Sequence, residues 1–233
     1  MNDSSQPLET NSAGIWVNPS DVGNGNERPA ILSVVKDLPN IITLLGLSSG
    51  VFGIYLALLG SFHAAIIAML WAVLFDWYDG TVARRMPERN YVLRSVGIHL
   101  DSLADIVSSA VCPAIILLSY GNFSPWFFPG ALALVMAGVV RLAYFDTFGV
   151  HGDGTITGLS IDISPLVVAL VFLLNGVLDQ PAFAVLFYAT VVVLAFLHVA
   201  PFRMRKMVGR WYYFVTAYVL IMTVTYFIII GPS

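Results

Sequence analysis

Long apolar segments alternate with short polar ones from residue 41 to the end of the chain. A bilayer core of about 30 Å needs about 20 apolar residues for each helix that crosses it. On that measure the pattern predicts seven spans, over residues 41–60, 62–84, 96–119, 125–147, 161–178, 182–200 and 211–230. The fifth and sixth of these are the segments most readily merged or misplaced. We therefore expect an all-α, polytopic transmembrane helix bundle of six to seven spans.

The amino-terminal region has a different composition. Residues 1–30 are rich in Asn, Ser, Gly, Pro and acidic residues, which is typical of a segment without a packed core. No basic stretch followed by an apolar one is visible there, so we expect no cleaved signal peptide. Residues 30–38 predict a short amphipathic interfacial helix that ends before Pro39. The predicted organisation is a disordered cytoplasmic tail over residues 1–29 and one transmembrane domain over residues 30–233.

Composition supports a membrane protein. Hydrophobic residues make up 58% of the chain and charged residues 11%, whereas a soluble domain carries about 25% charged residues. The formal net charge of −3 argues against nucleic acid as a partner. The one cysteine, Cys112, has no partner within the chain, which excludes a scaffold held by internal disulfides. Membrane lipids are therefore the expected surroundings.

Lysine and arginine predict the orientation of the spans. If the amino terminus is cytoplasmic, the inner connections are residues 85–95, 148–160 and 201–210. All the basic residues lie in these segments, in the amino-terminal region or at an inner helix end: Arg28, Lys36, Arg84, Arg85, Arg89, Arg94, Arg141, Arg203, Arg205, Lys206 and Arg210. This distribution follows the rule that positive charge stays inside. Aromatic residues at 126–128 and 211–213 are interpreted as interfacial anchors.

Four aspartates lie inside the predicted spans, close to the cytoplasmic end. Asp76 and Asp79 lie near the end of the second span, and Asp101 and Asp105 lie near the start of the third. At about 100° per residue, each pair lies on one helical face, and an inner hairpin brings the two faces together. Carboxylates in a membrane need a partner, and sets of oxygen ligands suit Mg²⁺ or Mn²⁺. The pattern favours a site for two divalent cations at a phosphoryl centre.

Small residues and an arginine accompany the acids. Gly80 and Ala83 lie one turn apart on the face of the aspartates, and Gly97 lies on the facing helix. Their bare backbone leaves room for a flat or phosphate-bearing ligand. Arg84 is placed to pair with a phosphate.

Other interpretations of the same residues remain open. A single aspartate in a membrane helix can serve interhelical hydrogen bonding or an ion pathway, and the glycines can be sites of close helix packing. The histidines are scattered, and no ligand role is assigned to them: His63, His99, His151 and His198.

The order and spacing of these residues resemble a known signature. The chain reads Asp76-x₂-Asp79-Gly80-x₂-Ala83-Arg84 and then Gly97-x₃-Asp101-x₃-Asp105, which is similar to the signature of the CDP-alcohol phosphotransferases. The resemblance extends from about Pro39 to Lys206. The spacer between Arg84 and Gly97 is longer than in most members and is similar to that of bacterial phosphatidylcholine synthases. We expect it to lengthen the cytoplasmic loop without moving the helical faces.

The resemblance implies a mechanism. Asp76, Asp79 and Asp101 would hold two divalent cations on the diphosphate of a CDP-linked lipid such as CDP-diacylglycerol. Asp105 would ligate a metal or act as the catalytic base for the acceptor hydroxyl, after which CMP leaves. The positions expected around the nucleotide and its phosphates are Asn40, Thr43, Gly80, Ala83, Arg84 and Gly97. A homodimer in the bacterial inner membrane, with its active site facing the cytoplasm, is expected by analogy.

Three features bear on the acceptor alcohol. Residues 100–114 are similar to a stretch of the phosphatidylserine synthases, and Arg141 matches an arginine of theirs that could bind a carboxylate. Residues 157–170 match in part, but Ser160 and Asp162 replace prolines. Tyr144 and Asp146 are further departures from those enzymes. Arg141, Ser160 and Asp162 are therefore the candidate acceptor-binding residues.

Three hypotheses follow from these features. The first is phosphatidyl transfer to L-serine. The second is the same reaction with another alcohol, choline first and then inositol or glycerol phosphate, because extra acid favours a cationic head group. The third is a non-enzymatic cation channel or transporter that uses the acids as an ion path.

Overall fold

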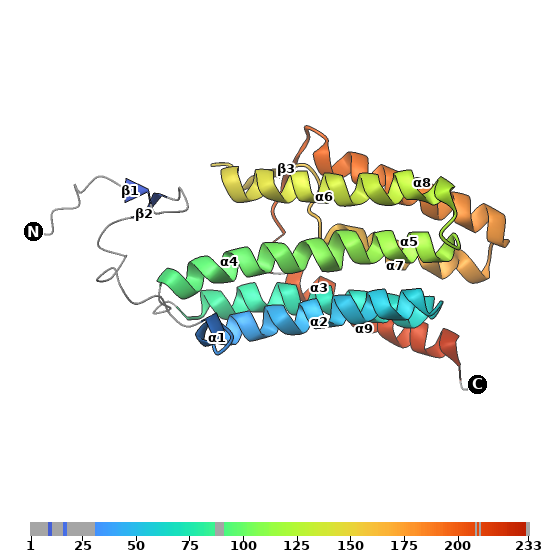
Figure 1. Ribbon diagram of the computed structural model, residues 1–233, viewed down its shortest axis with the longest axis horizontal. Coiled ribbons are helices and arrows are strands. Elements are labelled where there is room, and N and C mark those ends of the chain that lie inside the picture. The colour runs from blue at the N-terminus through green and yellow to red at the C-terminus, as the bar shows by residue number, and fades with distance from the viewer. Residues whose placement is uncertain are drawn as a thin grey trace, which may run out of the picture.

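The computed structural model describes residues 9–10, 16–17, 31–86, 91–207, 209 and 211–231. Within them, long helices run side by side along the longest axis (Figure 1). The predicted tail lies outside the described residues, apart from two short paired strands, β1 (Glu9–Thr10) and β2 (Trp16–Val17). The remaining elements are α1 (Ile31–Val34), α2 (Leu38–Leu58), α3 (Phe62–Arg84), α4 (Tyr91–Asp105), η1 (Ile106–Val111), α5 (Cys112–Tyr120), η2 (Pro125–Phe127), α6 (Phe128–Phe148), β3 (Thr155–Thr157), α7 (Ile163–Phe172), η3 (Leu173–Gly176), α8 (Gln180–Val199), β4 (Arg203–Arg205) and α9 (Trp211–Ile230).

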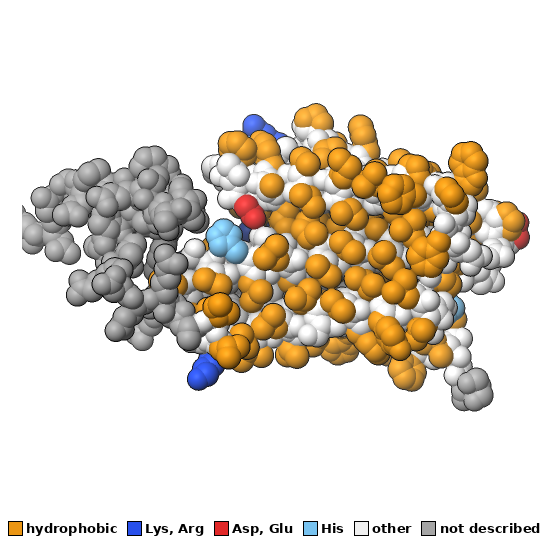
Figure 2. All heavy atoms as spheres, in the orientation of Figure 1, with side chains coloured by type: hydrophobic (Ala, Val, Ile, Leu, Met, Phe, Trp, Pro, Cys, Tyr) orange, Lys and Arg blue, Asp and Glu red, His pale blue; other side chains and the backbone are white. Residues whose placement is uncertain are grey.

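The helices confirm a polytopic membrane bundle. Within the described part of the chain, six helices are long and apolar enough to cross a membrane: Leu38–Leu58, Phe62–Arg84, Val92–Tyr120, Pro125–Phe148, Gln180–Val199 and Trp211–Ile230. Hydrophobic side chains cover the flank of the bundle, and the few charged ones seen in this view lie near its ends (Figure 2). Such a surface matches a lipid environment, because hydrocarbon offers no partner for polar groups.

The segment predicted as the fifth span is shorter than expected. Helix α7 and the 3₁₀ turn η3 together cover only Ile163–Gly176, below the length that a full crossing needs. The residues before α7 are not helical. Residues 158–162, which we call the acceptor loop, line the interior of the bundle instead. Irregular backbone at this depth is tolerated because protein surrounds it or a cavity adjoins it.

The first two helices begin and pack differently from the simplest expectation. The predicted interfacial helix is a single turn, α1, and Pro39 lies in the first turn of α2, where a missing N–H group costs nothing. Further along α2, a Cβ atom at Gly50 would lie 3.0 Å from the Ser108 side chain, and one at Gly53 would lie 3.1 Å from the Ala65 carbonyl. These glycines therefore allow α2 to approach its neighbours closely.

The third span contains a widened turn directly after the second aspartate pair. The helix is α-helical to Asp105, π-helical over η1 and α-helical again from Cys112. Pro113 cannot donate a backbone hydrogen bond, and its ring crowds the carbonyl of Ser109, so the turn before it opens. The backbone N–H of Cys112 accordingly donates to the carbonyl of Val107, five residues earlier.

Two of the connections between helices pair with each other, which the sequence pattern did not predict. Strand β3 pairs with β4 in antiparallel register, with Ile156 opposite Met204. This ribbon joins the α6–α7 connection to the α8–α9 connection.

At the opposite end of the bundle, the core is aromatic. Phe172, Phe183 and Phe187 are buried there around Tyr120, with ring centres 5.2–6.1 Å apart. This dense aromatic packing joins the helices that carry the site.

Candidate active site

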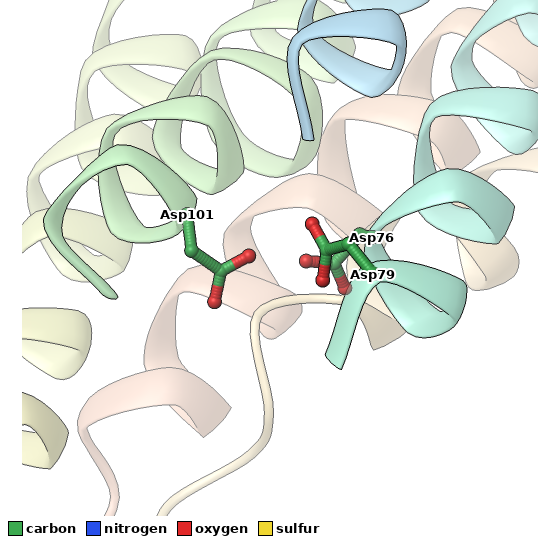
Figure 3. A group of neighbouring side chains, drawn as sticks. All are labelled: Asp76, Asp79 and Asp101. Atoms are coloured by element: carbon green, nitrogen blue, oxygen red, sulfur yellow. The ribbon is translucent and has the colours of Figure 1, made fainter. Parts of the chain in front are cut away.

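The four aspartates of the two spans meet between α3 and α4. Helix α3 carries Asp76 and Asp79 one turn apart, and α4 carries Asp101 and Asp105 one turn apart. Figure 3 shows the carboxylates of Asp76 and Asp79 facing that of Asp101 across the gap between the helices. Each of these three side chains offers an oxygen atom, and the three atoms lie within 4.8 Å of one another. The spacing lets one cation contact all three.

A fifth carboxylate joins this cluster from the acceptor loop. One oxygen atom each of Asp76, Asp105 and Asp162 also lies within 4.8 Å of the others. Asp76 therefore belongs to both groups. Asp162 comes from the loop before α7, far along the chain from the other acids.

A cavity of about 320 Å³ opens over the carboxylates. Nine of the residues predicted for the site line it: Asp76, Asp79, Gly80, Arg84, Asp101, Asp105, Arg141, Ser160 and Asp162. At Gly80 an added Cβ atom would lie 3.5 Å from the Arg84 guanidinium, which is ordinary contact, so the backbone is open to the cavity. The volume is in the range of small-molecule sites.

The other predicted nucleotide residues do not line this cavity. Thr43, on α2, donates a hydrogen bond from its hydroxyl to Asp79. Asn40 is buried, and its amide donates to the carbonyl of Val34 over 3.0 Å, which ties the start of α2 to α1. Ala83 and Gly97 lie on α3 and α4 but are not among the residues that line the cavity. In this structure Thr43 orients a carboxylate.

Arg84 is held by the last helix. Its guanidinium donates to the hydroxyls of Thr81, over 3.2 Å, and Tyr212. The guanidinium carbon lies 5.6 Å from the centre of the Tyr212 ring, and that ring packs edge-on against Trp77. Tyr212, which the sequence indicated as an interfacial anchor, therefore lines the cavity and orients a cation beside the aspartates.

The predicted acceptor residues form the opposite wall. Arg141, on α6, is 6% exposed and donates to the hydroxyl of Ser160 over 3.4 Å. Ser160 in turn lies 3.3 Å from a carboxylate oxygen of Asp162. The Nε atom of Arg141 is buried without a hydrogen-bond partner among the described residues. An unpaired buried donor is costly, so this wall is suited to receive an anionic group.

Comparison with known proteins decides the family. The model of the family described as CDP-alcohol phosphatidyltransferase matches residues 36–197, well over half of the chain. The chain belongs to the CDP-alcohol phosphatidyltransferase family. The matched range holds all the aspartates described above and the predicted acceptor residues.

Several curated members of this family are similar to the chain in sequence. Archaetidylserine synthase of Methanothermobacter thermautotrophicus is 36% identical over 142 residues, which cover 58% of this chain and 58% of that protein. CDP-diacylglycerol–serine O-phosphatidyltransferase of Methanocaldococcus jannaschii is 32% identical over 151 residues, or 64% of this chain and 67% of that protein. The enzyme of the same name from Bacillus subtilis is 27% identical over 111 residues, or 47% of this chain and 60% of that protein. The aligned part thus spans 58% to 67% of these relatives' lengths.

The clustered carboxylates fit the divalent cations that the family signature implies. The ligand atoms are oxygens, which hard cations prefer. The Oδ1 atom of Asp101 is buried and has no hydrogen-bond partner among the described residues. A bound cation would satisfy that atom and offset the repulsion among the clustered carboxylates. The residues therefore fit a metal site that lines the cavity.

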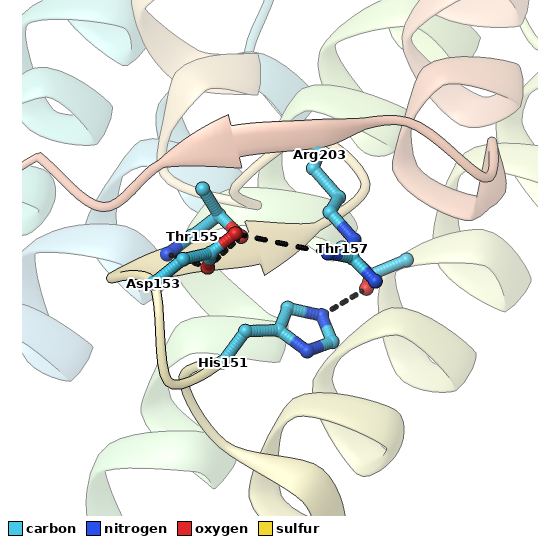
Figure 4. Close-up of polar contacts among 5 residues, drawn as sticks. All are labelled: His151, Asp153, Thr155, Thr157 and Arg203. Carbon is cyan, nitrogen blue, oxygen red and sulfur yellow. Dashed lines mark hydrogen bonds and ion pairs between the residues drawn. The ribbon is translucent and has the colours of Figure 1, made fainter.

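The β3–β4 ribbon lines the mouth of the same cavity. Ile156 and Met204 are opposite each other and both line the cavity. Figure 4 shows the outer side of the ribbon, where Arg203 lies 3.7 Å from Asp153 and His151 bonds to Thr157 over 2.8 Å. Hydrogen bonds from Thr155 lower the pKa of the exposed Asp153 carboxyl. These contacts stabilise the turn that places Ile156.

Several cavity residues were not singled out as contact residues by the sequence. Phe145 lies with its ring centre 5.0 Å from the Arg141 guanidinium carbon and 5.2 Å from the ammonium nitrogen of Lys206. Ser102 donates to Asp146 over 2.8 Å and so links α4 to α6 at the mouth. In the sequence, Asp146 stood out only as a departure from related enzymes. The one usable signal for Phe145 was its position four residues after Arg141, which puts both on one helical face.

Proposed function

We propose that the protein transfers the phosphatidyl group of CDP-diacylglycerol to the hydroxyl of L-serine and releases phosphatidylserine and CMP. Family membership supports the reaction class, and two of the relatives above carry the name of this reaction. The observation that carries the choice of acceptor is buried Arg141, whose Nε atom has no partner among the described residues, on the wall opposite the clustered aspartates.

On the donor side, the proposed ligands are Asp76, Asp79, Asp101 and Asp105. Two divalent cations, Mg²⁺ or Mn²⁺, would neutralise the diphosphate and make its phosphorus more electrophilic when bound there. Thr43 holds the Asp79 carboxylate in place, and Arg84, oriented by Tyr212, pairs with a phosphate oxygen. We also propose that Asn40, Ala83 and Gly97 shape the backbone around the nucleotide.

Proton transfer is proposed for Asp105, which lines the cavity beside Asp162. The serine oxygen forms a bond to the phosphorus that carries diacylglycerol, the bond from that phosphorus to the CMP oxygen breaks, and the hydroxyl proton passes to Asp105. A carboxylate that ligates a metal is a weak base at neutral pH, so its effect would come from placement next to the hydroxyl.

On the acceptor side, a serine molecule presents a carboxylate and an ammonium group. Arg141 is proposed to bind the carboxylate through paired N–H groups, and Asp162 to face the ammonium group. Ser160 lies between the two and hydrogen-bonds to both, which holds the opposite charges at a fixed separation. Because Asp162 and Asp105 share one cluster, the ammonium group and the reacting hydroxyl would be close together, as they are in serine.

Choline is the second candidate acceptor. Asp146 and Asp162 both line the cavity, and acid at the acceptor side favours a quaternary ammonium head group. Choline lacks a carboxylate and would leave the buried Nε atom of Arg141 without a partner, which is why we prefer serine.

The proposed location is the cell's inner membrane, with the cavity facing the cytoplasm. The support is the position of the lysines and arginines, which the sequence places at the end of the bundle that carries the aspartates and the β3–β4 ribbon. The proposal extends to a homodimer, for which the family resemblance is the support, and the mass of the purified protein in detergent tests it.

The reaction is tested by release of CMP from purified protein given CDP-diacylglycerol and Mn²⁺, with serine, choline, inositol and glycerol 3-phosphate supplied separately. CMP release with serine alone is the expected result. Release with choline alone would transfer the assignment to the second acceptor. No CMP with any alcohol, together with metal-dependent ion flux in vesicles, would replace the enzyme with a transporter.

A further inference from the structure

The acceptor loop lacks helical hydrogen bonds, yet it carries two of the three proposed acceptor residues. Its first part is tied to the end of α8 through the backbone. The N–H of Gly158 donates to the carbonyl of Phe202 over 2.9 Å, and the N–H of Leu159 donates to that of Leu197 over 3.0 Å. Gly158 has a φ of +72°, and a Cβ atom there would collide with the carbonyl oxygen of His198. The loop is therefore pressed directly onto the last turn of α8.

His198 lies at that turn and contacts both ends of the acceptor loop. Its Nδ1 atom lies 3.1 Å from the carbonyl oxygen of Leu159, and its Nε2 atom lies 2.7 Å from the hydroxyl of Ser164 in the first turn of α7. His198 is 2% exposed and Ser164 is fully buried. Ser160 and Asp162 lie between these two contact points in the chain.

The two hydrogen bonds assign the protons. A carbonyl oxygen can only accept, so Nδ1 carries the hydrogen and donates to Leu159. In the neutral ring Nε2 is then an acceptor, and the hydroxyl of Ser164 donates to it. Both ring nitrogens are satisfied inside the bundle, and neither is available to a ligand. A buried ring that makes two hydrogen bonds fixes the distance between the two segments that it joins.

We infer that His198 is a positioning residue for the acceptor, acting through the loop that holds Ser160 and Asp162. This inference rests on the proposed function, in which those two residues contact the acceptor alcohol. Without the ring, Leu159 and Ser164 lose their hydrogen bonds to α8, and Ser160 and Asp162, which lie between them, move relative to Arg141. The donor aspartates lie on α3 and α4, whereas the hydrogen bonds of the His198 ring reach the acceptor loop and α7. The larger effect is therefore expected on the acceptor.

The test compares three substitutions of His198 by their kinetics of CMP release. His198→Ala removes both bonds and is expected to raise the serine KM about tenfold, the effect of about two lost neutral hydrogen bonds. The KM for CDP-diacylglycerol is expected to stay within about twofold of the unmodified protein. His198→Asn places an amide near Nδ1 and keeps the Leu159 bond, whereas His198→Gln places one near Nε2 and keeps only the Ser164 bond. The serine KM of His198→Asn is expected to lie close to that of the unmodified protein. The serine KM of His198→Gln is expected to lie close to that of His198→Ala.

A matched control removes another buried hydrogen bond to α7. The hydroxyl of Tyr226 donates to the carbonyl of Ala169 over 2.5 Å, away from the acceptor loop. Tyr226→Phe is expected to leave the serine KM unchanged within about twofold, because it alters helix packing and not the loop. If His198→Ala does not accumulate as folded protein, Ser164→Ala and His198→Asn supply the comparison, because each removes only one of the two hydrogen bonds.

Equal rises in the KM of serine and CDP-diacylglycerol in the His198 variants, or a serine KM unchanged in all of them, would overturn the positioning role. The unmodified protein distinguishes that failure from failure of the proposed function. If it releases CMP with choline and not with serine, the acceptor assignment is wrong, and the same comparison with choline decides the role of His198.

Discussion

The two halves of the cavity are built in different ways. The donor half, made of Asp76, Asp79, Asp101 and Asp105, sits on two long helices joined by one connection. The acceptor half, made of Arg141, Ser160 and Asp162, combines one helix with a non-helical loop that depends on contacts to α8. Both halves supply charge to the same space.

The difference shows how position is enforced in each half. Regular helices hold side chains three and four residues apart on one face whatever the rest of the chain does. A loop has no regular spacing of side chains. The positions of its side chains therefore depend on hydrogen bonds between the loop backbone and Leu197, His198 and Phe202. The donor half should therefore respond to substitutions of its own residues, and the acceptor half also to substitutions elsewhere.

The strongest test of the comparison is Asp76, which belongs to both carboxylate groups. Asp76→Asn is expected to lower the kcat of CMP release with serine at least about 100-fold, because a charged ligand is lost at the reacting phosphorus. Chelation of divalent cations with EDTA should abolish the activity and added Mn²⁺ should restore it. A higher serine KM with an unchanged kcat would place Asp76 in the acceptor half instead.

Arg141→Ala follows with a smaller and more selective effect. Hydrogen bonds to a charged group contribute about 1.5–3 kcal/mol, so the serine KM is expected to rise about 10- to 100-fold. The KM for CDP-diacylglycerol should change little, as steady-state kinetics at saturating serine would measure. A KM for serine that stays constant would mean that Arg141 has no acceptor role.

Asp162→Asn separates an acceptor residue from a fifth metal ligand. We expect the serine KM to rise about tenfold, because a charged partner of the ammonium group becomes neutral. The Mn²⁺ concentration for half-maximal activity should stay the same. If instead that concentration rises while the serine KM is constant, Asp162 belongs to the donor half.

Tyr212→Phe has the smallest expected effect. It removes the hydroxyl that accepts from Arg84 and keeps the aromatic face, so the KM for CDP-diacylglycerol should rise about two- to fivefold. The serine KM should remain constant in the same assay. Tyr213→Phe, on the neighbouring exposed residue, is the matched control and should behave like the unmodified protein.

Much of the bundle and of the donor half could be predicted from the sequence. Six of the seven predicted spans correspond to helices long enough to cross a membrane, because the requirement for apolar length is local. The length of the fifth helix was overestimated. An apolar run of this length is compatible both with a full crossing and with the shorter α7 and its preceding loop. Tyr212 was interpreted by its place at a span end, and only its contact with Arg84 revealed a second role.

What the sequence determined by itself is the membrane environment, the helical faces and the order of the donor aspartates, because each follows from spacing within one segment. The tertiary structure decided that Asp162 joins the carboxylates, that Ile156 and Met204 meet over the cavity, and that His198 links the two sides of the acceptor loop. These contacts join residues separated by tens of positions. Their geometry depends on how the helices pack, and no local pattern records it.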